Sequence, residues 1–353
     1  MKQFYNTVRQ LHIEPSRKCN AQCPMCARYL GSSTNVAPWV NEEDVSIEKL
    51  TGLLEKLDLE SISLNGNYGD IVMHYDPKSL IELCCHNAKS VVVHTNGGAQ
   101  NKNFWKYIAK FKNLTVIFAI DGLSDTHHLY RRNTRFDVVI NNAKTYIDAG
   151  GKAAWDMVIF KHNEHQVDEC KSLSKELGFY KFASKPNARY GKSKYPVHNK
   201  NFEVEYYIES IDAIKNIENH QTKRPLETKK NYDDFVNADH TKHRSIKNSC
   251  ISCRVIKDQS VFISADNRVW PCCWLGQMAN KSESKFSYSD FEKNYGKQNI
   301  IENFDTIVKS FDTISQSWNT NTPFYECAVN CNVKHKADGV ITKETSIIST
   351  SES

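Results

Sequence analysis

Residues 11–28 read LHIEPSRKCNAQCPMCAR and carry three cysteines, Cys19, Cys23 and Cys26, in the spacing C-x3-C-x2-C. They follow residues 8–14, which have the composition of a short β-strand. A structural zinc site or an ordinary [4Fe–4S] cluster takes four protein ligands, whereas a cubane held by three cysteines leaves one iron open. The motif therefore predicts a cluster with an open iron. A zinc loop that borrows a distant His or Cys is the alternative.

The bulk composition is that of a globular chain of about two structural units. Of its 353 residues, 40% are hydrophobic and 25% charged, and no stretch has the length and apolarity of a membrane-spanning helix. Residues 1–15 lack the apolar core of a secretory signal, so we expect a cytoplasmic protein without a membrane partner. In the cytoplasm, 12 cysteines indicate metal binding or catalysis rather than disulfides. The net charge of +5 is modest and dispersed, so nucleic acid is not an expected partner.

Short β-rich runs alternate with helical patterns through residues 8–185, which predicts an α/β fold. The expected strands are 8–14, 61–65, 90–95, 114–121, 153–160 and 179–184. The expected helices lie near 46–57, 77–88, 102–112, 136–149 and 163–177. Six such units indicate a partial (β/α)6 TIM-type barrel, in which the chemistry lies at the carboxyl ends of the strands.

The domain organisation that we expect has four parts. Residues 1–185 form the barrel, and residues 186–247 are a polar connecting segment in which 202–217 show an apolar helical period. Residues 248–340 form a cysteine-bearing unit that opens with a hairpin whose arms are 260–264 and 268–270. The Ser/Thr-rich residues 341–353 are expected to be a disordered tail.

The cysteine motif, with Asn20 and Pro24 in familiar places, resembles the radical S-adenosylmethionine (radical SAM) superfamily. The resemblance implies that Cys19, Cys23 and Cys26 hold a [4Fe–4S] cluster whose open iron binds the amino and carboxylate groups of S-adenosylmethionine. It also implies reductive cleavage of that cofactor to a 5′-deoxyadenosyl radical, which abstracts a substrate hydrogen. The cofactor carries this chemistry, and the protein orients and shields it.

Turns after the next strands extend the resemblance. Residues 65–70, NGNYGD, stand where the family has a Gly-Gly-Glu-Pro turn, so Gly69 and Asp70 would bind the ammonium group of the cofactor. Asp70 replaces the usual Glu and Ile71 the usual Pro, and a plain β-turn is the alternative. Asn96 lies in a Thr-Asn-Gly turn that is also typical of the family.

The fourth strand leads into residues 118–122, FAIDG, followed by His127 and by Arg131 and Arg132. This segment resembles the family's Ser-x-Asp-Gly…His…Arg pattern and implies that Asp121 belongs to the cofactor site. An arginine fork suits the cofactor carboxylate, so either Arg131 or Arg132 would bind it. Either arginine could instead be a surface ion-pair residue.

A second cysteine region resembles the SPASM/twitch extension, whose members carry auxiliary iron–sulfur clusters. Its six cysteines are Cys250, Cys253, Cys272, Cys273, Cys327 and Cys331. The resemblance implies one auxiliary [4Fe–4S] cluster on Cys250, Cys253, Cys272 and Cys331, with Cys327 as the rival for the last place. A zinc ribbon on the same thiols is the alternative. Cys84, Cys85 and Cys170 lie on expected helices and are interpreted as buried structural residues.

The resemblance implies a radical SAM oxidoreductase that oxidatively modifies or cross-links a peptide or protein side chain. A dehydrogenase or rearrangement enzyme for a small metabolite is the alternative, and a zinc or iron–sulfur protein that binds a partner is the non-enzymatic one. The expected electron donor is a flavodoxin or ferredoxin-type protein. Because the barrel begins near residue 8, a peptide would be short, held by residues 186–247, or presented by a separate protein. No acid or base residue stands out.

Overall fold

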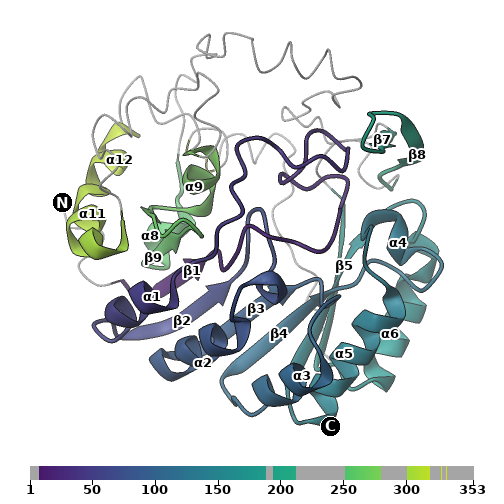
Figure 1. Ribbon diagram of the computed structural model, residues 1–353, viewed down its shortest axis with the longest axis horizontal. Coiled ribbons are helices and arrows are strands. Elements are labelled where there is room, and N and C mark those ends of the chain that lie inside the picture. Colours follow the sequence, from purple (N-terminus) through teal and green to yellow (C-terminus); the bar gives the residue numbers. More distant parts are fainter. Residues whose placement is uncertain are drawn as a thin grey trace.

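A computed structural model describes residues 8–187, 194–211, 251–279 and 300–318, together with Cys327 and Cys331. An eight-stranded sheet forms the centre of the protein, in the order β10-β9-β1-β2-β3-β4-β5-β6 (Figure 1). All neighbouring strands in it run parallel except β10 and β9. This arrangement confirms the α/β fold predicted from the alternating pattern.

The first six strands pair in chain order. They are β1 (Gln10–Ile13), β2 (Leu59–Leu64), β3 (Ala88–Thr95), β4 (Leu114–Ala119), β5 (Lys152–Ile159) and β6 (Lys181–Pro186). The connecting helices are α1 (Ile47–Leu54), η1 (Ile71–Met73), α2 (Pro77–Asn87), α3 (Lys102–Ile108), α4 (His127–Tyr130), α5 (Phe136–Asp148), η2 (Glu164–Gln166) and α6 (Val167–Glu176). Figure 1 shows α1, α2, α3, α5 and α6 along one face of the sheet. Each strand and each long helix predicted in this region is present.

Local sequence signals explain where the helices begin. Ser46, Asp76 and Asn101 each accept a hydrogen bond from the backbone N–H three residues ahead, so they cap α1, α2 and α3. Pro77 follows its cap at the first helical position, where no N–H is needed. Burial alternates along β1 and β4, so one face of these strands is buried in the core and the other is half-buried.

The cysteine-bearing C-terminal unit joins this same sheet. Its hairpin consists of β9 (Ser260–Ile263) and β10 (Val269–Trp270), and β9 lies parallel to β1. Asn267 adopts φ 62° in the hairpin turn, a left-handed conformation that Asn tolerates. The helices of the unit are α8 (Arg254–Lys257), α9 (Cys273–Ala279), η5 (Ile301–Asn303), α11 (Phe304–Ser310) and α12 (Asp312–Ser317). The hairpin thus extends the sheet of the barrel.

The helical expectation for residues 202–217 is wrong within the described part of that stretch. An antiparallel hairpin lies here, formed by β7 (Tyr195–His198) and β8 (Val204–Ile208). Tyr195, Val197 and Ile208 pack in one buried cluster with Met25 and Phe160. Aromatic and β-branched residues suit a strand once such a surface covers them, and this packing overrides the weak helical period.

Several expectations concern residues outside the described ranges. They include most of the connecting segment and the whole of residues 341–353. The four-part domain division therefore stays a prediction. Within the ranges that the structure describes, no helix is both long and apolar enough to span a membrane.

Candidate cluster and cofactor site

The three N-terminal cysteines lie in the loop between β1 and α1, residues 14–46, here called the cysteine loop. The backbone N–H of Cys26 donates to the carbonyl of Cys23 at 3.0 Å, and Tyr29 continues this turn with a bond of 3.2 Å to Cys26. The N–H of Gln22 donates to the carbonyl of Arg132 at 2.8 Å, which ties the loop to the segment after α4. The loop is thus anchored on both sides of the thiols.

Burial raises the pKa of the Cys19 thiol, and the nearby charges of Asp70, Cys23 and Cys26 raise it further. Burial also raises the pKa of Cys23 to about 11, although the Arg131 guanidinium opposes this shift. Each of these two thiols lies near enough to Cys26 for its charge to raise their pKa values. A positive metal centre is the partner that stabilises thiolates in such surroundings.

Two N–H donors face the sulfur atoms. The side-chain amide of Asn96 lies 3.7 Å from Sγ of Cys19, and Nη1 of Arg131 lies 3.7 Å from Sγ of Cys23. Hydrogen bonds to cluster sulfur are a recurrent means of tuning iron–sulfur centres. Among the described residues, no three His, Cys, Asp or Glu side chains are grouped tightly enough for a single metal ion. A cubane binds each thiolate through a different iron, and the three thiols with their donors fit that requirement.

The turn of residues 65–70, here called the glycine turn, lies directly against the cysteine loop. A Cβ added at Gly69 would lie 2.1 Å from the carbonyl oxygen of Ser16, so only glycine fits there. The N–H of Asp70 donates to the carbonyl of Lys18 at 2.9 Å. The turn predicted to bind the cofactor ammonium is therefore fixed beside Cys19.

Asp70 is buried and uses both carboxylate oxygens within the protein. Oδ1 accepts bonds from the hydroxyl of Thr95 at 2.7 Å and from the N–H of Val72 at 3.1 Å. Oδ2 accepts bonds from the backbone and side-chain amides of Asn96 at 2.7 and 2.8 Å. The structure thus brings Gly69, Asp70 and Asn96 together with Cys19, and Asp70 orients Asn96.

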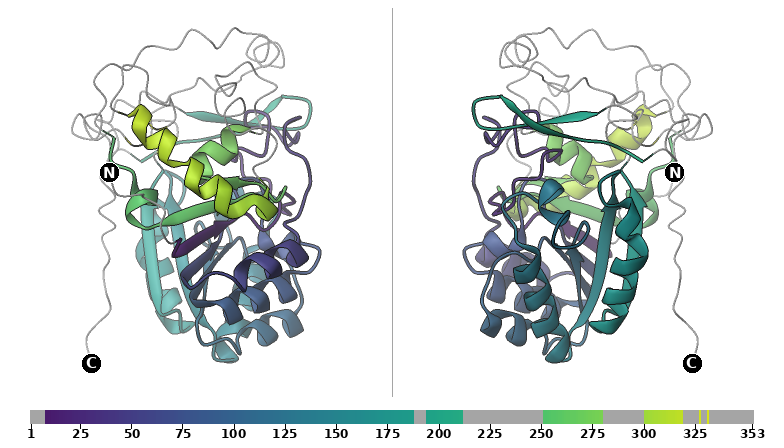
Figure 2. Two further views of the ribbon diagram at one scale, coloured as in Figure 1. Left: turned by 90° about the vertical axis from the view of Figure 1, so that its left-hand side faces the viewer. Right: turned by 90° about the vertical axis from the view of Figure 1, so that its right-hand side faces the viewer.

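The two candidate arginines have different partners. Nε of Arg131 donates to Oδ2 of the fully buried Asp121 at 2.6 Å. Arg132 contacts the β7–β8 hairpin instead, through the carbonyl of His198 at 3.0 Å and Oε2 of Glu205 at 2.5 Å. Figure 2 shows this hairpin beside the cysteine loop, above the sheet. Of the two arginines, Arg131 is therefore the one next to a thiol of the predicted cluster.

The structure also brings most of the C-terminal cysteines together. A side-chain hydrogen bond from Cys331 lowers the pKa of Cys253 to about 6. Burial raises the pKa of Cys272, with further contributions from the charges of Cys273, Cys327 and Cys253. Cys250 lies outside the described residues. Cys253, Cys272, Cys327 and Cys331 thus share one neighbourhood, whereas Cys84, Cys85 and Cys170 are buried on α2 and α6 as predicted.

Sequence reasoning missed Glu14 and Tyr68, which join these parts. Oε1 of the buried Glu14 accepts bonds from the N–H groups of Asn67 and Tyr68, both at 3.0 Å. Its Oε2 accepts a bond of 3.1 Å from Nε of Arg17. A carboxylate directly after the first strand was the available signal, but the N–H groups of Asn67 and Tyr68 that it accepts from lie more than 50 residues further along the chain.

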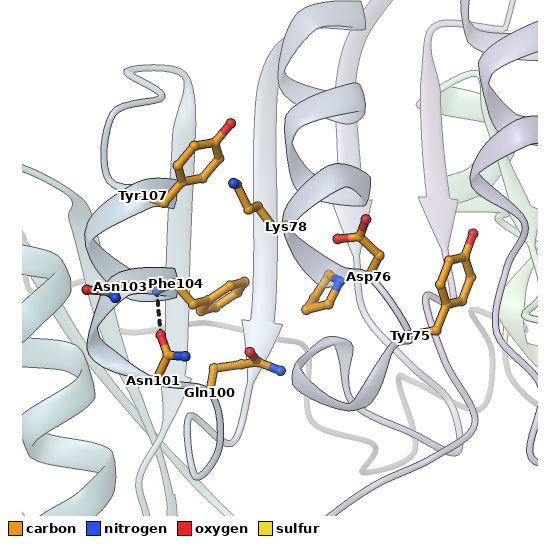
Figure 3. Close-up of a pocket in the computed structure, with 9 residues that line it drawn as sticks. Tyr75, Asp76, Lys78, Gln100, Asn101, Asn103, Phe104 and Tyr107 are labelled. Atoms are coloured by element: carbon orange, nitrogen blue, oxygen red, sulfur yellow. Dashed lines mark hydrogen bonds between the residues drawn. The ribbon is translucent and has the colours of Figure 1, made fainter.

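A separate groove of about 390 Å³ lies between the amino ends of α2 and α3 (Figure 3). Its lining includes Asp76 and Asn101, which cap the two helices, and Lys78, whose ammonium lies 3.8 Å from the ring centre of Tyr107. None of the predicted site residues lines it. Asp76, Asn101 and Gln100 each make a hydrogen bond within the protein, and we assign the groove no role.

Comparison with known proteins agrees with this geometry. The family described as the Radical SAM superfamily matches residues 13–173, which span β1 to α6. The chain is 24% identical over 214 residues to the antilisterial bacteriocin subtilosin biosynthesis protein AlbA of Bacillus subtilis (strain 168), covering 58% of this chain and 46% of AlbA. It thus spans about half the length of this curated relative.

Two solved structures share the fold. One is native anSMEcpe with bound AdoMet, with a TM-score of 0.51 and 15% identity over 93% of this chain and 95% of that one. The other is Streptococcus suis SuiB bound to precursor peptide SuiA, with a TM-score of 0.50 and 15% identity over 91% of this chain and 76% of that one.

The fold, the cysteine loop and the family match identify residues 13–173 as a radical SAM domain, the class of iron–sulfur protein that the cysteine motif predicted. The recognition made from the cysteine motifs, including the SPASM/twitch subgroup, is confirmed. The predicted cofactors are also those of this group: a [4Fe–4S] cluster, S-adenosylmethionine and an auxiliary cluster. Which residues bind them stays a prediction.

Proposed function

We propose that this protein is a radical SAM oxidoreductase that modifies a peptide or protein side chain. The observation that carries the proposal is the three-cysteine loop, against which Asn96 after β3 and Arg131 after α4 direct N–H groups at two sulfur atoms. When bound, the cluster and S-adenosylmethionine supply reductive cleavage and hydrogen abstraction. The protein's own groups hold, orient and shield these cofactors.

Each site residue has a defined part in the proposal. Cys19, Cys23 and Cys26 hold the cluster, and the backbone at Gly69 offers carbonyl acceptors to the cofactor ammonium. Arg131 offers the cofactor carboxylate its remaining N–H groups, while the buried carboxylate of Asp121 fixes the orientation of the guanidinium.

Asp70 and Asn96 complete the first site. The four hydrogen bonds that Asp70 accepts keep the glycine turn and Asn96 in place beside Cys19. Asp70 thereby supports the cofactor site through its neighbours, and Asn96 acts on the cluster thiol. Arg132 serves the β7–β8 hairpin, which covers the cysteine loop.

The auxiliary cluster would be held by Cys253, Cys272 and Cys331, with Cys250 as the fourth ligand and Cys327 as its rival. Three of these residues interact with one another in the described part of the unit. A flavodoxin or ferredoxin-type protein would supply the electron in the cytoplasm. A thiol-rich chain with two clusters suits that reducing compartment.

A peptide substrate is favoured over a small metabolite. AlbA, which is named for the biosynthesis of a bacteriocin, supports this choice, as does the solved relative bound to a precursor peptide. The described β7–β8 hairpin beside the cysteine loop would contact such a peptide. This hairpin belongs to residues 186–247, the segment that the sequence suggested could bind a peptide substrate.

The proposal is tested with anaerobically reconstituted protein, dithionite and S-adenosylmethionine. We expect about eight irons per chain, four per cluster, and release of 5′-deoxyadenosine. A C19A/C23A/C26A variant should lose about four irons and all cleavage. Cys170→Ala, which removes a buried cysteine outside both groups, should keep iron and cleavage.

Mass spectrometry of candidate peptides after turnover then tests the substrate class. Loss of hydrogen from a side chain or formation of a cross-link would support it. Zinc bound in place of iron would favour the non-enzymatic alternative, a metal protein that binds a partner. A full iron content without cleavage of S-adenosylmethionine would reject the proposed enzymatic function. Cleavage with product formed only from a small metabolite would reject the peptide substrate.

A further inference from the structure

The glycine turn lies between the two cysteine-bearing parts of the protein. On one side, Gly69 fits against the backbone of Ser16, and the N–H of Asp70 donates to Lys18. On the other side, the side-chain amide of Asn67 donates to the carbonyl of Cys273 at 3.0 Å. One short turn thus touches both the cysteine loop and the first residue of α9.

Tyr68 makes the second contact with α9. Its hydroxyl donates to the carbonyl of Gln277 at 2.7 Å, and the residue is 1% exposed. The two contacts from Asn67 and Tyr68 therefore hold α9 at positions one turn apart. Since α9 begins directly after Cys272, a ligand bound by that thiol would fix the end of the helix that the turn contacts.

The buried carboxylate of Glu14, directly after β1, also holds the glycine turn in place. This carboxylate accepts the N–H groups of Asn67 and Tyr68, and it also accepts a bond of 3.3 Å from the N–H of Ala265 in the β9–β10 hairpin. Arg17, in the cysteine loop, pairs with Glu14 and lies 3.0 Å from Asp266 in that hairpin. A buried ion-pair network therefore joins the cysteine loop, the glycine turn and the C-terminal hairpin.

We propose that Tyr68 and Asn67 are positioning residues that couple the auxiliary cluster to S-adenosylmethionine binding. The carboxylate of Glu14 holds the backbone of both residues in place. Occupation of the auxiliary site holds α9, α9 holds the glycine turn through its two hydrogen bonds, and the turn then binds the cofactor more tightly. This inference rests on the proposed function, because it takes the glycine turn as part of the cofactor site.

The packing of the turn explains why a displacement would be transmitted. A Cβ at Gly66 would lie 2.2 Å from the carbonyl oxygen of Gly69, and Gly69 itself has no free space beside Ser16. A turn packed this closely moves as a unit, since interiors are close-packed. A shift at Tyr68 therefore moves the carbonyl groups at Gly69.

The test measures the dissociation constant of S-adenosylmethionine by equilibrium dialysis, without turnover. Tyr68→Phe, which removes one hydroxyl, is compared with the parent chain in two backgrounds: the full protein with both clusters and a C253A/C272A variant that lacks the auxiliary cluster. We expect about a fivefold weaker affinity in the full protein, the effect of one buried hydrogen bond, and less than about twofold in the variant.

Tyr146→Phe is the matched control. Tyr146 is also buried, and its hydroxyl donates to a backbone carbonyl, that of Leu114, at 3.3 Å, but it contacts neither cysteine group. It should leave the affinity unchanged in both backgrounds. Asn67→Ala, which removes the other bond to α9, should repeat the result of Tyr68→Phe.

Three outcomes would overturn the inference. One is an equal effect of Tyr68→Phe in both backgrounds, and another is no effect in either. The third is loss of the iron bound by Cys19, Cys23 and Cys26 in both Tyr68→Phe and Asn67→Ala. That result would make the contact between the glycine turn and α9 purely structural. Failure of the parent protein to bind S-adenosylmethionine would instead reject the proposed function.

Discussion

Arg131 and Asp121 form an ion pair in which Nε lies 2.6 Å from Oδ2, and the carboxylate is fully buried. Asp121 also accepts a bond of 2.5 Å from the N–H of Val158 on β5. The guanidinium is therefore held in one orientation, with Nη1 toward Cys23. The neighbouring Arg132 has no part in this arrangement and pairs with the β7–β8 hairpin.

Replacing Arg131 by Gln should therefore reduce cofactor cleavage by more than about tenfold, because a charge-assisted contact near the cofactor is lost. Arg132→Gln is the matched control and should retain cleavage within about threefold, since it removes an ion pair with the partly exposed Glu205 on the hairpin and no contact to a thiol. Both are measured as 5′-deoxyadenosine formed per reconstituted cluster. Equal losses in the two variants would count against the assignment of Arg131.

Replacing Asp70 by Asn should destabilise the fold. All four bonds to the Asp70 carboxylate come from N–H or O–H donors, so an amide NH2 would face a donor in either orientation. We expect a loss of about 2–3 kcal/mol in the free energy of unfolding, followed in urea.

Asp76→Asn is the control for that substitution. Asp76 caps α2, and Asn is as good an N-cap residue, so the change in unfolding free energy should stay below about 0.5 kcal/mol. A D70N protein as stable as the parent would show that the network around Asn96 contributes little.

The buried His127 gives a pH dependence. Its Nδ1 accepts a bond from the N–H of Asp121 at 3.3 Å, and Nε2 lies 3.0 Å from the hydroxyl of Thr134. Burial and the charge of Arg131 lower the pKa of His127 to about 3, from about 6.5 in the unfolded chain. The unfolded state then binds more protons, so the stabilisation is complete above pH 6.5 and declines as the pH falls toward 3.

At pH 5.0 this single group should cost about 2 kcal/mol of unfolding free energy relative to pH 7.5. The variant His127→Gln should lose that part of the pH dependence. His128→Gln, at the adjacent exposed position, should keep it. The free energy of unfolding in urea is measured at both pH values for each protein. An unchanged pH dependence in H127Q would show that His127 is not the group responsible.

The fourth ligand of the auxiliary cluster can be tested with two alanine variants. Cys331 donates a hydrogen bond to Cys253, whereas Cys327 is buried in the hydrophobic core. We expect C331A to lose about four irons and C327A to keep them. Iron analysis of each reconstituted protein gives the answer, and the reverse pattern would make Cys327 the ligand.

Most of the sheet was predictable because its strands and helices alternate and the residues that begin the helices are recognisable in the sequence. Ser46 and Asp76 cap helices at the positions where the sequence begins its helical patterns. The β7–β8 hairpin was not predictable, since Tyr195 and Val197 become strand residues by packing on Met25 in a distant loop. Tertiary burial decided the structure of that segment.

In the candidate site too, some residues could be found from the sequence and others only from the folded chain. The thiols of Cys19, Cys23 and Cys26 follow from local spacing, so the sequence was sufficient to find them. The choice between Arg131 and Arg132 depends on which guanidinium faces Cys23, and only the folded chain determines that. Glu14 was missed because the partners that place it at the glycine turn and the C-terminal hairpin are backbone N–H groups, which carry no sequence signal.

The central claim, an open cluster iron that binds S-adenosylmethionine, is tested most directly by electron paramagnetic resonance. The measurement uses the C253A/C272A variant after dithionite reduction, so that the signal comes from the Cys19, Cys23 and Cys26 cluster alone. We predict a reduced [4Fe–4S] signal that changes when S-adenosylmethionine is added. A signal that stays the same with and without the cofactor, or the absence of an iron–sulfur signal, would contradict the account.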